Sequence, residues 1–333
     1  MGLKKKYTIF FATLFLIFLF NPVNAQDIDI QPPSQPLSGP GGLDYNHSQI
    51  ITYSYGQGAQ QYWIFEPASP KPDSAPVIVF NHGWAATNPI IYQAWINHLV
   101  KKGNIVIYPR YQNNIFDSSD NFTQNAIYSV RDALKQLQSG NHVRPQIDNL
   151  AIVGHSAGGI ISINMAVRAS SEGIPIPKAV FSVEPGKSRS SEDQMGPIME
   201  NMSNISIKTL LLTLAGDKDD IVGNNDAKKI ISDTPQVPAK NKDYILMVSD
   251  EHGSPALEAD HLAPLAVWNS NNFTVLVNGL DYYGTWKLFD GLYEAAFYGK
   301  NKEYALGNSS QQRFMGFWSD GKPVKELIIL DTP

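Results

Sequence analysis

The chain has 333 residues, of which 43% are hydrophobic and 17% are charged, with a formal net charge of −5 and no cysteine. This length and composition suffice for one large α/β domain with its own core, and the mild, dispersed acidity argues against a nucleic-acid surface. The absence of cysteine excludes disulfides, thiolate catalysis and cysteine-ligated zinc.

Residues 1–25 predict a signal peptide. Three lysines at 4–6 precede an apolar run over about 9–20, and small residues lead to Ala25. The run is shorter than the roughly 20 residues that a spanning helix needs, which favours cleavage before Gln26 over an uncleaved membrane anchor. We therefore expect a secreted or periplasmic protein without a stable membrane span after cleavage.

The next stretch, residues 26–48, is a Pro/Gly-rich arm, typical of an extended linker or surface segment, and we assign it no function. Residues 49–333 then predict a single α/β domain without internal repeats. Apolar and polar residues alternate along 50–55 and along 61–66, with a Gly-Gln-Gly turn between the two runs. This pattern indicates an antiparallel hairpin at the edge of a sheet.

Six short runs of consecutive apolar residues follow, as in strands that are covered on both faces. They lie at 77–80, 105–108, 150–153, 179–183, 210–214 and 244–248. Helical periods lie at about 92–101, 124–138, 157–169 and 227–232, with a last aromatic-striped helix at 282–297. The stretch after residue 297 predicts either packing against the domain or a C-terminal strand at about 327–330. The alternation predicts an α/β fold with a mostly parallel sheet between two helical layers.

The central motif is Gly154-His155-Ser156-Ala157-Gly158, between the third apolar run and a small-residue helix. A strand, a sharp turn and a helix around G-x-S-x-G are the context of a nucleophile elbow. The flanking glycines let strand and helix approach closely around a strained serine. Ser156 is therefore the predicted nucleophile.

An acyl-transfer site also needs amide donors for the developing oxyanion. Gly83 after the first apolar run lets the backbone turn inward, so we expect the N–H groups of Trp84 and Ala157 to form the oxyanion hole. His82 is either a second base or, as we favour, a side chain that supports this loop through a hydrogen bond.

The acid and the base come later, in the chain order Ser, Asp, His. Asp219 is the predicted acid, since the following Ile221 and Val222 would bury it, whereas Asp217 and Asp220 would cap a helix or face solvent. His252 and His261 both follow the last central strand. Nearness to that strand favours His252 as the base.

The sequence resembles the α/β-hydrolase superfamily, and within it the secreted cutinase-like and polyester-hydrolase esterases with their dienelactone-hydrolase and platelet-activating-factor-acetylhydrolase relatives. The resemblance rests on Gly83-Trp84, on Asp219 before a spacer and an Ile/Val pair, and on Ala259-Asp-His-Leu-Ala-Pro264. It implies His261 as the base and leaves His252 as the alternative. Departures are His82 where the family often has Pro, the missing disulfides, and extra length at 250–257.

These features predict a secreted serine hydrolase that cleaves carboxylic esters through an acyl-enzyme and needs no cofactor or metal. The substrate is a small-molecule, lipid or polymer ester, contacted by Trp84, His155 and Glu184, with the loop 108–111 and the segment after Val183 as further walls. Residues 186–206 form either a movable lid or a solvated loop. A catalytically inactive binding protein, a serine peptidase and an acyltransferase on the same fold are the alternatives.

Overall fold

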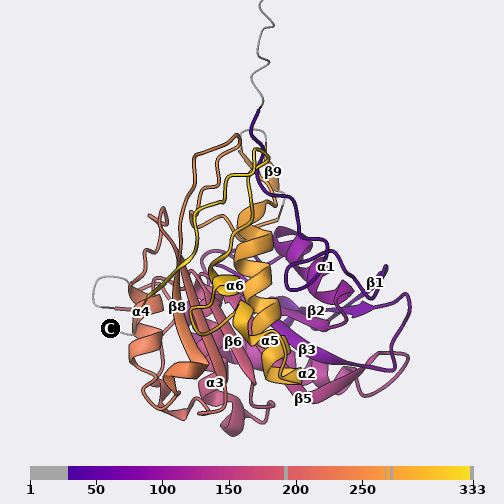
Figure 1. The fold of residues 1–333 in the computed structure, drawn as a ribbon. Helices are drawn as coiled ribbons and strands as arrows, with labels where there is room; N and C mark the ends of the chain where they lie inside the picture. The colour runs from indigo at the N-terminus through magenta and orange to yellow at the C-terminus, as the bar shows by residue number, and fades with distance from the viewer. Residues whose placement is uncertain (1–28, 191–193, 267, 271–272, 331–333) are drawn as a thin grey trace, which may run out of the picture.

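The computed structural model describes residues 29–190, 194–266, 268–270 and 273–330 (Figure 1). The predicted signal peptide, residues 1–25, lies outside the described residues. Within the described residues, no helix combines the length and the apolar character that crossing a bilayer requires.

Nine strands of the described chain form one sheet, in the order β1-β2-β4-β3-β5-β6-β7-β8-β11. Their bounds are β1 Ile50–Tyr55, β2 Tyr62–Pro67, β3 Ser74–Asn81, β4 Ile105–Pro109, β5 Arg144–His155, β6 Ala179–Val183, β7 Leu210–Gly216, β8 Lys242–Met247 and β11 Ile328–Leu330. The pairs from β4 through β3, β5, β6 and β7 to β8 are parallel, while β1, β2 and β11 join antiparallel. The expected α/β fold, the edge hairpin and the C-terminal strand are confirmed.

The longer helices are α1 Gln93–Lys101, α2 Phe122–Gln136, α3 Ala157–Glu172, α4 Asn225–Ser232 and α5 Lys287–Tyr298, within a few residues of the expected periods. Short elements complete the description: η1 Gly58–Gln60, η2 Pro89–Tyr92, η3 Ser119–Asn121, η4 Met202–Asn204, η5 Ala239–Asn241, η6 Leu280–Trp286, η7 Lys302–Tyr304, α6 Ser310–Arg313, and a small sheet of β9 Trp268–Ser270 and β10 Phe273–Val275. The last predicted helix is a π-helical segment, η6, continued by α5.

Side chains on alternate positions of β3 enter opposite layers of the core, as the strand pleat requires. Ile78 and Phe80 pack with α1 and α5, whereas Val77 and Val79 pack with α2 and α3. Figure 1 shows α5 lying across one face of the sheet. Burial on both faces explains why the central strands are apolar at consecutive positions.

The N-terminal arm lies against the domain through specific contacts. The Gly41 amide donates to Asp290 on α5 at 2.8 Å, and Lys102 donates to the Gly39 carbonyl at 3.0 Å. Pro33, Pro40 and the following glycines are buried. Proline and glycine therefore do not leave this segment as a free linker, because its backbone groups find partners on the domain.

Candidate active site

Ser156 stands at the turn between β5 and α3. Its backbone has φ 57° and ψ −127°, a sparsely populated conformation for a residue with a side chain. A Cβ on Gly154 would lie 2.1 Å from the Gly158 carbonyl oxygen, and a Cβ on Gly158 would lie 2.3 Å from the Asn81 carbonyl oxygen. Glycine is therefore required on both sides of the serine, as the motif predicts.

His261 lies between Ser156 and Asp219. Its Nε2 is 2.9 Å from Ser156 Oγ, and its Nδ1 is 2.8 Å from Asp219 Oδ2. An ionised carboxylate only accepts hydrogen bonds, so Nδ1 carries the proton and Nε2 is free to accept one from the serine hydroxyl. The structure thus brings together three predicted residues that are up to 105 positions apart in the sequence.

Asp219 is held by the turn that follows β7. Its Oδ1 accepts hydrogen bonds from the amides of Ile221, at 3.0 Å, and Val222, at 2.9 Å. Burial alone would raise the pKa of this carboxyl, but the hydrogen bonds from His261 and from these amides outweigh it and bring the pKa below its usual value. The carboxylate is therefore ionised and oriented.

The other two carboxylates of this turn do not approach His261. Asp217 accepts from the Ser249 amide, at 3.0 Å, and from its hydroxyl, and so ties the β7 and β8 ends together instead of capping a helix. Asp220 is exposed, as expected.

His252 lies in a separate environment. Its Nε2 is 2.7 Å from Asp320 Oδ2, its ring meets Trp318 edge to face, and it does not line the cavity above Ser156. Between the two histidines that follow β8, the geometry therefore selects His261 as the partner of Ser156. The extra residues between β8 and His261 include an isolated antiparallel bridge that pairs Asp250 with Leu257.

The loop after β3 brings Trp84 beside Ser156. The Gly83 amide donates to the Tyr92 hydroxyl at 3.0 Å, and a Cβ on Gly83 would lie 3.3 Å from Ser156 Cβ. The Gly83 amide is already bonded, whereas the amides of Trp84 and Ala157 have no backbone or side-chain acceptor among the described residues. Both residues line the cavity.

His82 supports this loop from beneath. Its Nδ1 is 2.6 Å from the Gly83 carbonyl oxygen, its Nε2 is 2.7 Å from the Arg110 carbonyl oxygen, and its ring stacks on Tyr111. Burial lowers the pKa of His82 to about 4 and outweighs the two carbonyl contacts, which favour the protonated ring. A neutral ring donates to one of the two carbonyl oxygens. It does not line the cavity, which fits the supporting role.

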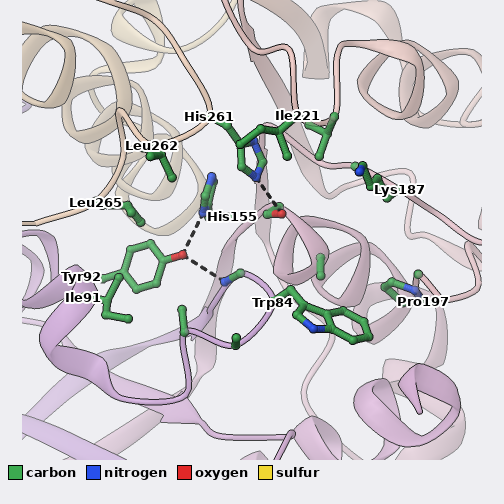
Figure 2. Close-up of a pocket in the computed structure, with 18 of the residues that line it drawn as sticks. Trp84, Ile91, Tyr92, His155, Lys187, Pro197, Ile221, His261, Leu262 and Leu265 are labelled. Carbon is green, nitrogen blue, oxygen red and sulfur yellow. Dashed lines mark hydrogen bonds between the residues drawn. The ribbon is translucent and has the colours of Figure 1, made fainter. Parts of the chain in front are cut away.

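Tyr92 is a site residue that the sequence analysis missed. Its hydroxyl accepts a hydrogen bond from the Gly83 amide and lies 2.8 Å from His155 Nδ1 (Figure 2). The pKa of His155 is well below its usual value because of burial, with repulsion from His261 as a smaller cause. A neutral His155 thus links the oxyanion loop to the residue before the nucleophile.

Glu184 was expected to contact the substrate, but it is fully buried and does not line the cavity. Its Oε2 lies 3.3 Å from His155 Nε2 and 3.8 Å from His261 Nδ1, behind both rings. Burial, together with the charges of Asp219 and Asp260, raises the pKa of this carboxyl well above its usual value. The backbone of Glu184 has a positive φ of 44°, and the side chain lies against the two histidine rings instead of entering the cavity.

The cavity above Ser156 has a volume of about 690 Å³ and is lined mainly by apolar side chains. Figure 2 shows Ile91, Tyr92, Leu262 and Leu265 on one side and Trp84, Pro197 and Lys187 on the other. Trp84, His155 and Gly186 line it as predicted. The loop 108–111 does not, because Tyr108 and Tyr111 turn into the core and are fully buried.

Three side chains near Ser156 have the spacing of a possible metal site. His155, Glu184 and His261 offer ligand atoms that all lie within 4.8 Å of one another. His261 Nδ1 already bonds Asp219, so a cation at these atoms would compete with that hydrogen bond. That the reaction needs no metal or cofactor stays a prediction.

The sequence is similar to known proteins in two comparisons. Residues 45–214 match the family model described as chlorophyllase. The chain is also 22% identical over 280 residues to a methylphloroacetophenone synthase of Cladonia uncialis, covering 81% of this chain but 10% of that protein. The chain thus spans about a tenth of the length of that relative.

The match confirms the expected superfamily, whereas the narrower likeness to cutinase-like esterases stays a prediction. By its sequence match and its fold, the chain belongs to the chlorophyllase family, an α/β-hydrolase-type family of esterases.

Proposed function

We propose that the protein is a serine hydrolase that cleaves carboxylic esters through an acyl-enzyme. The observation that carries the proposal is the unbroken hydrogen-bond chain from Ser156 Oγ through His261 to Asp219, at the floor of an apolar cavity. A nucleophile, a base and an acid joined in this order are the arrangement that serine hydrolases share.

In the proposed reaction, Ser156 Oγ attacks the ester carbonyl while His261 Nε2 takes the hydroxyl proton. Asp219 holds Nδ1–H and stabilises the imidazolium that forms. The amides of Trp84 and Ala157 donate to the oxyanion. His261 then returns its proton to the leaving alcohol, and a water molecule, activated by the same ring, releases the acid and restores the serine.

The cavity favours esters with an apolar acyl or alcohol group. Ile91, Leu262 and Leu265 form one wall, and Trp84 and Pro197 belong to the other. Burying each methylene of a substrate against such walls contributes about 0.8 kcal/mol. We therefore propose p-nitrophenyl esters of short and medium fatty acids as assay substrates.

The test is the hydrolysis of p-nitrophenyl butyrate by the wild type and by Ser156→Ala. We expect the variant to fold normally and to lose at least about 10⁴-fold in kcat/KM, since only oxyanion and binding effects would remain. An inactive wild type would support the non-catalytic alternative, and a variant retaining more than about a hundredth of the rate would show that another nucleophile acts.

We also propose that the protein is exported, because residues 4–25 have the charge, the apolar run and the small residues of a signal peptide. Mass spectrometry of the N-terminus would find Gln26 at or near the start of protein recovered outside the cytoplasm. An intact Met1 on membrane-bound protein would instead indicate an anchor.

A further inference from the structure

Glu184 is a buried carboxyl group that the proposed reaction does not use. Its side chain is fully buried, and neither carboxyl oxygen has a hydrogen-bond partner within the part of the chain that the structure describes. Buried polar groups are nearly always hydrogen-bonded, and an exception calls for an explanation such as a bound ion. The carboxyl faces two imidazole nitrogens, since its Oε2 lies 3.3 Å from His155 Nε2 and 3.8 Å from His261 Nδ1.

The spacing of these three groups suits a zinc ion. Their ligand atoms all lie within 4.8 Å of one another. Ligand atoms placed tetrahedrally at about 2.1 Å from Zn²⁺ are about 3.4 Å apart, which falls between the two distances from Glu184 to the rings. The two rings lie side by side, with centroids 4.7 Å apart, and both line the cavity, so an ion reaches them from that side (Figure 2).

The surroundings of these groups favour a cation. Asp219 and Asp260 both act on Glu184 through negative charges, which would attract a metal ion at the same position. His155 Nδ1 lies 2.8 Å from the Tyr92 hydroxyl oxygen, which can accept its proton and leave Nε2 free to bind a metal. Histidines that bind metals usually donate their second ring N–H to a neighbouring oxygen in this way.

We propose that His155, Glu184 and His261 bind Zn²⁺ reversibly, and that the bound ion inhibits the hydrolase. Two imidazoles and a carboxylate are ligands that zinc prefers, whereas Mg²⁺ and Ca²⁺ prefer oxygen ligands.

The inhibition follows from the chemistry of the His261 ring. Zn²⁺ would replace the proton on Nδ1 and the proton on the Glu184 carboxyl. A neutral imidazole that binds a metal through Nδ1 carries its proton on Nε2, so it can no longer accept the proton of the Ser156 hydroxyl. Asp219 would lose its hydrogen-bond donor at the same time. The inhibition therefore rests on the proposed function, whereas the metal site itself does not.

Equilibrium dialysis against zinc chloride tests the site without any activity measurement. We expect about one tightly bound Zn²⁺ per wild-type protein, and binding at least about tenfold weaker in Glu184→Gln and in His155→Gln, since each removes one ligand. His252→Ala is the matched control, because it removes a histidine that contacts Asp320 away from these groups, and it should bind as the wild type does. No tight binding by the wild type, or ligand variants that bind as tightly as the control, would overturn the proposal.

Crystals of the wild type soaked in zinc chloride give a measurement that does not depend on the folding of any variant. The anomalous zinc signal should lie between Glu184, His155 and His261. A signal only at other positions would refute the site.

An activity test separates this inference from the proposed function. Zn²⁺ should stop hydrolysis of p-nitrophenyl butyrate by the wild type, a chelator should restore it, and equal concentrations of Mg²⁺ or Ca²⁺ should have no effect. Glu184→Gln, compared with its own zinc-free rate, should need at least about tenfold more Zn²⁺ for the same inhibition. A wild type that is inactive without zinc would contradict the proposed function and leave the site to the binding test. A wild type that binds Zn²⁺ at these side chains and stays active would refute the inhibition.

Discussion

The two ring nitrogens of His261 have separate partners, and the proposed chemistry depends on both contacts. Nε2 faces Ser156 Oγ at 2.9 Å, and Nδ1 faces Asp219 Oδ2 at 2.8 Å. Removing the ring would leave the serine without a base and the carboxylate without its donor. At the scale of single residues, the account therefore predicts that Ser156 and His261 act as one unit.

We expect His261→Ala to lose activity about as severely as Ser156→Ala, on the order of 10⁴-fold or more. The double variant Ser156→Ala/His261→Ala should be hardly worse than either single variant, because each already removes the shared function. Steady-state kinetics with p-nitrophenyl butyrate would measure this.

His252→Ala is the matched control, since His252 bonds Asp320 away from the cavity. Its activity should stay within about threefold of the wild type, as expected for a half-buried side chain outside the site. A severe loss in His252→Ala, combined with an active His261→Ala, would reverse the assignment of the base.

Glu184 gives a prediction about stability and pH. Burial raises the pKa of its carboxyl well above the usual value, so the folded protein holds a proton that the unfolded chain releases above about pH 4.3. The folded state then binds more protons than the unfolded state, and this group makes the protein less stable as the pH rises. Glu184→Gln removes the titration while keeping the shape.

Urea unfolding of the wild type and of Glu184→Gln at pH 5 and at pH 8 would measure the effect. The unfolding free energy of Glu184→Gln minus that of the wild type should be larger at pH 8 than at pH 5, because the variant has no carboxyl group at this position to titrate. A difference that stays constant with pH would mean that Glu184 is already ionised in the folded protein.

At the scale of elements, the elbow depends on the close approach of β3, β5 and α3. A Cβ on Gly158 would lie 2.3 Å from the carbonyl oxygens of both Asn81 and His82. These are backbone atoms at the end of β3, which cannot move without disturbing the oxyanion loop.

Gly158→Ala should therefore lower the free energy of unfolding by about 3 kcal/mol or more, or prevent folding. Gly279→Ala is the control, because its Cβ would meet only side-chain atoms, the Pro33 ring at 3.3 Å and Leu257 Cδ1 at 3.6 Å, and its φ of −58° suits any residue. The control should change stability by less than about 1 kcal/mol, measured by urea unfolding. Equal stability of the two variants would argue against the close-packed elbow.

The central elements were predictable because their sequence patterns are local. Consecutive apolar residues marked β3 to β8, and the glycines around Ser156 marked the turn between β5 and α3. The π-helical start of the last helix was not predictable, since η6 carries the same aromatic spacing as an α-helix.

Site residues that depend on distant partners were harder to predict. Tyr92 looks like a core aromatic in the sequence, and its role depends on Gly83 and on His155, which is 63 positions away. Glu184 follows a strand end as a pocket residue would, but its backbone turns it beneath the histidines. Tyr108 and Tyr111 were expected at the cavity for the same reason and instead pack in the core.

At the scale of the whole molecule, the parallel sheet gathers the site at one edge. The loops after β3, β5 and β7 supply Trp84, Ser156 and Asp219, and the segment after β8 supplies His261. The candidate active site therefore lies at one end of the fold, as is usual for open α/β sheets.

The most direct test of the central claim is covalent labelling with a fluorophosphonate, followed by peptide mass spectrometry. The account predicts one adduct per protein, on Ser156, formed much more slowly in His261→Ala and absent in Ser156→Ala. An unlabelled wild-type protein, or an adduct on a different residue, would contradict Ser156 as an activated nucleophile.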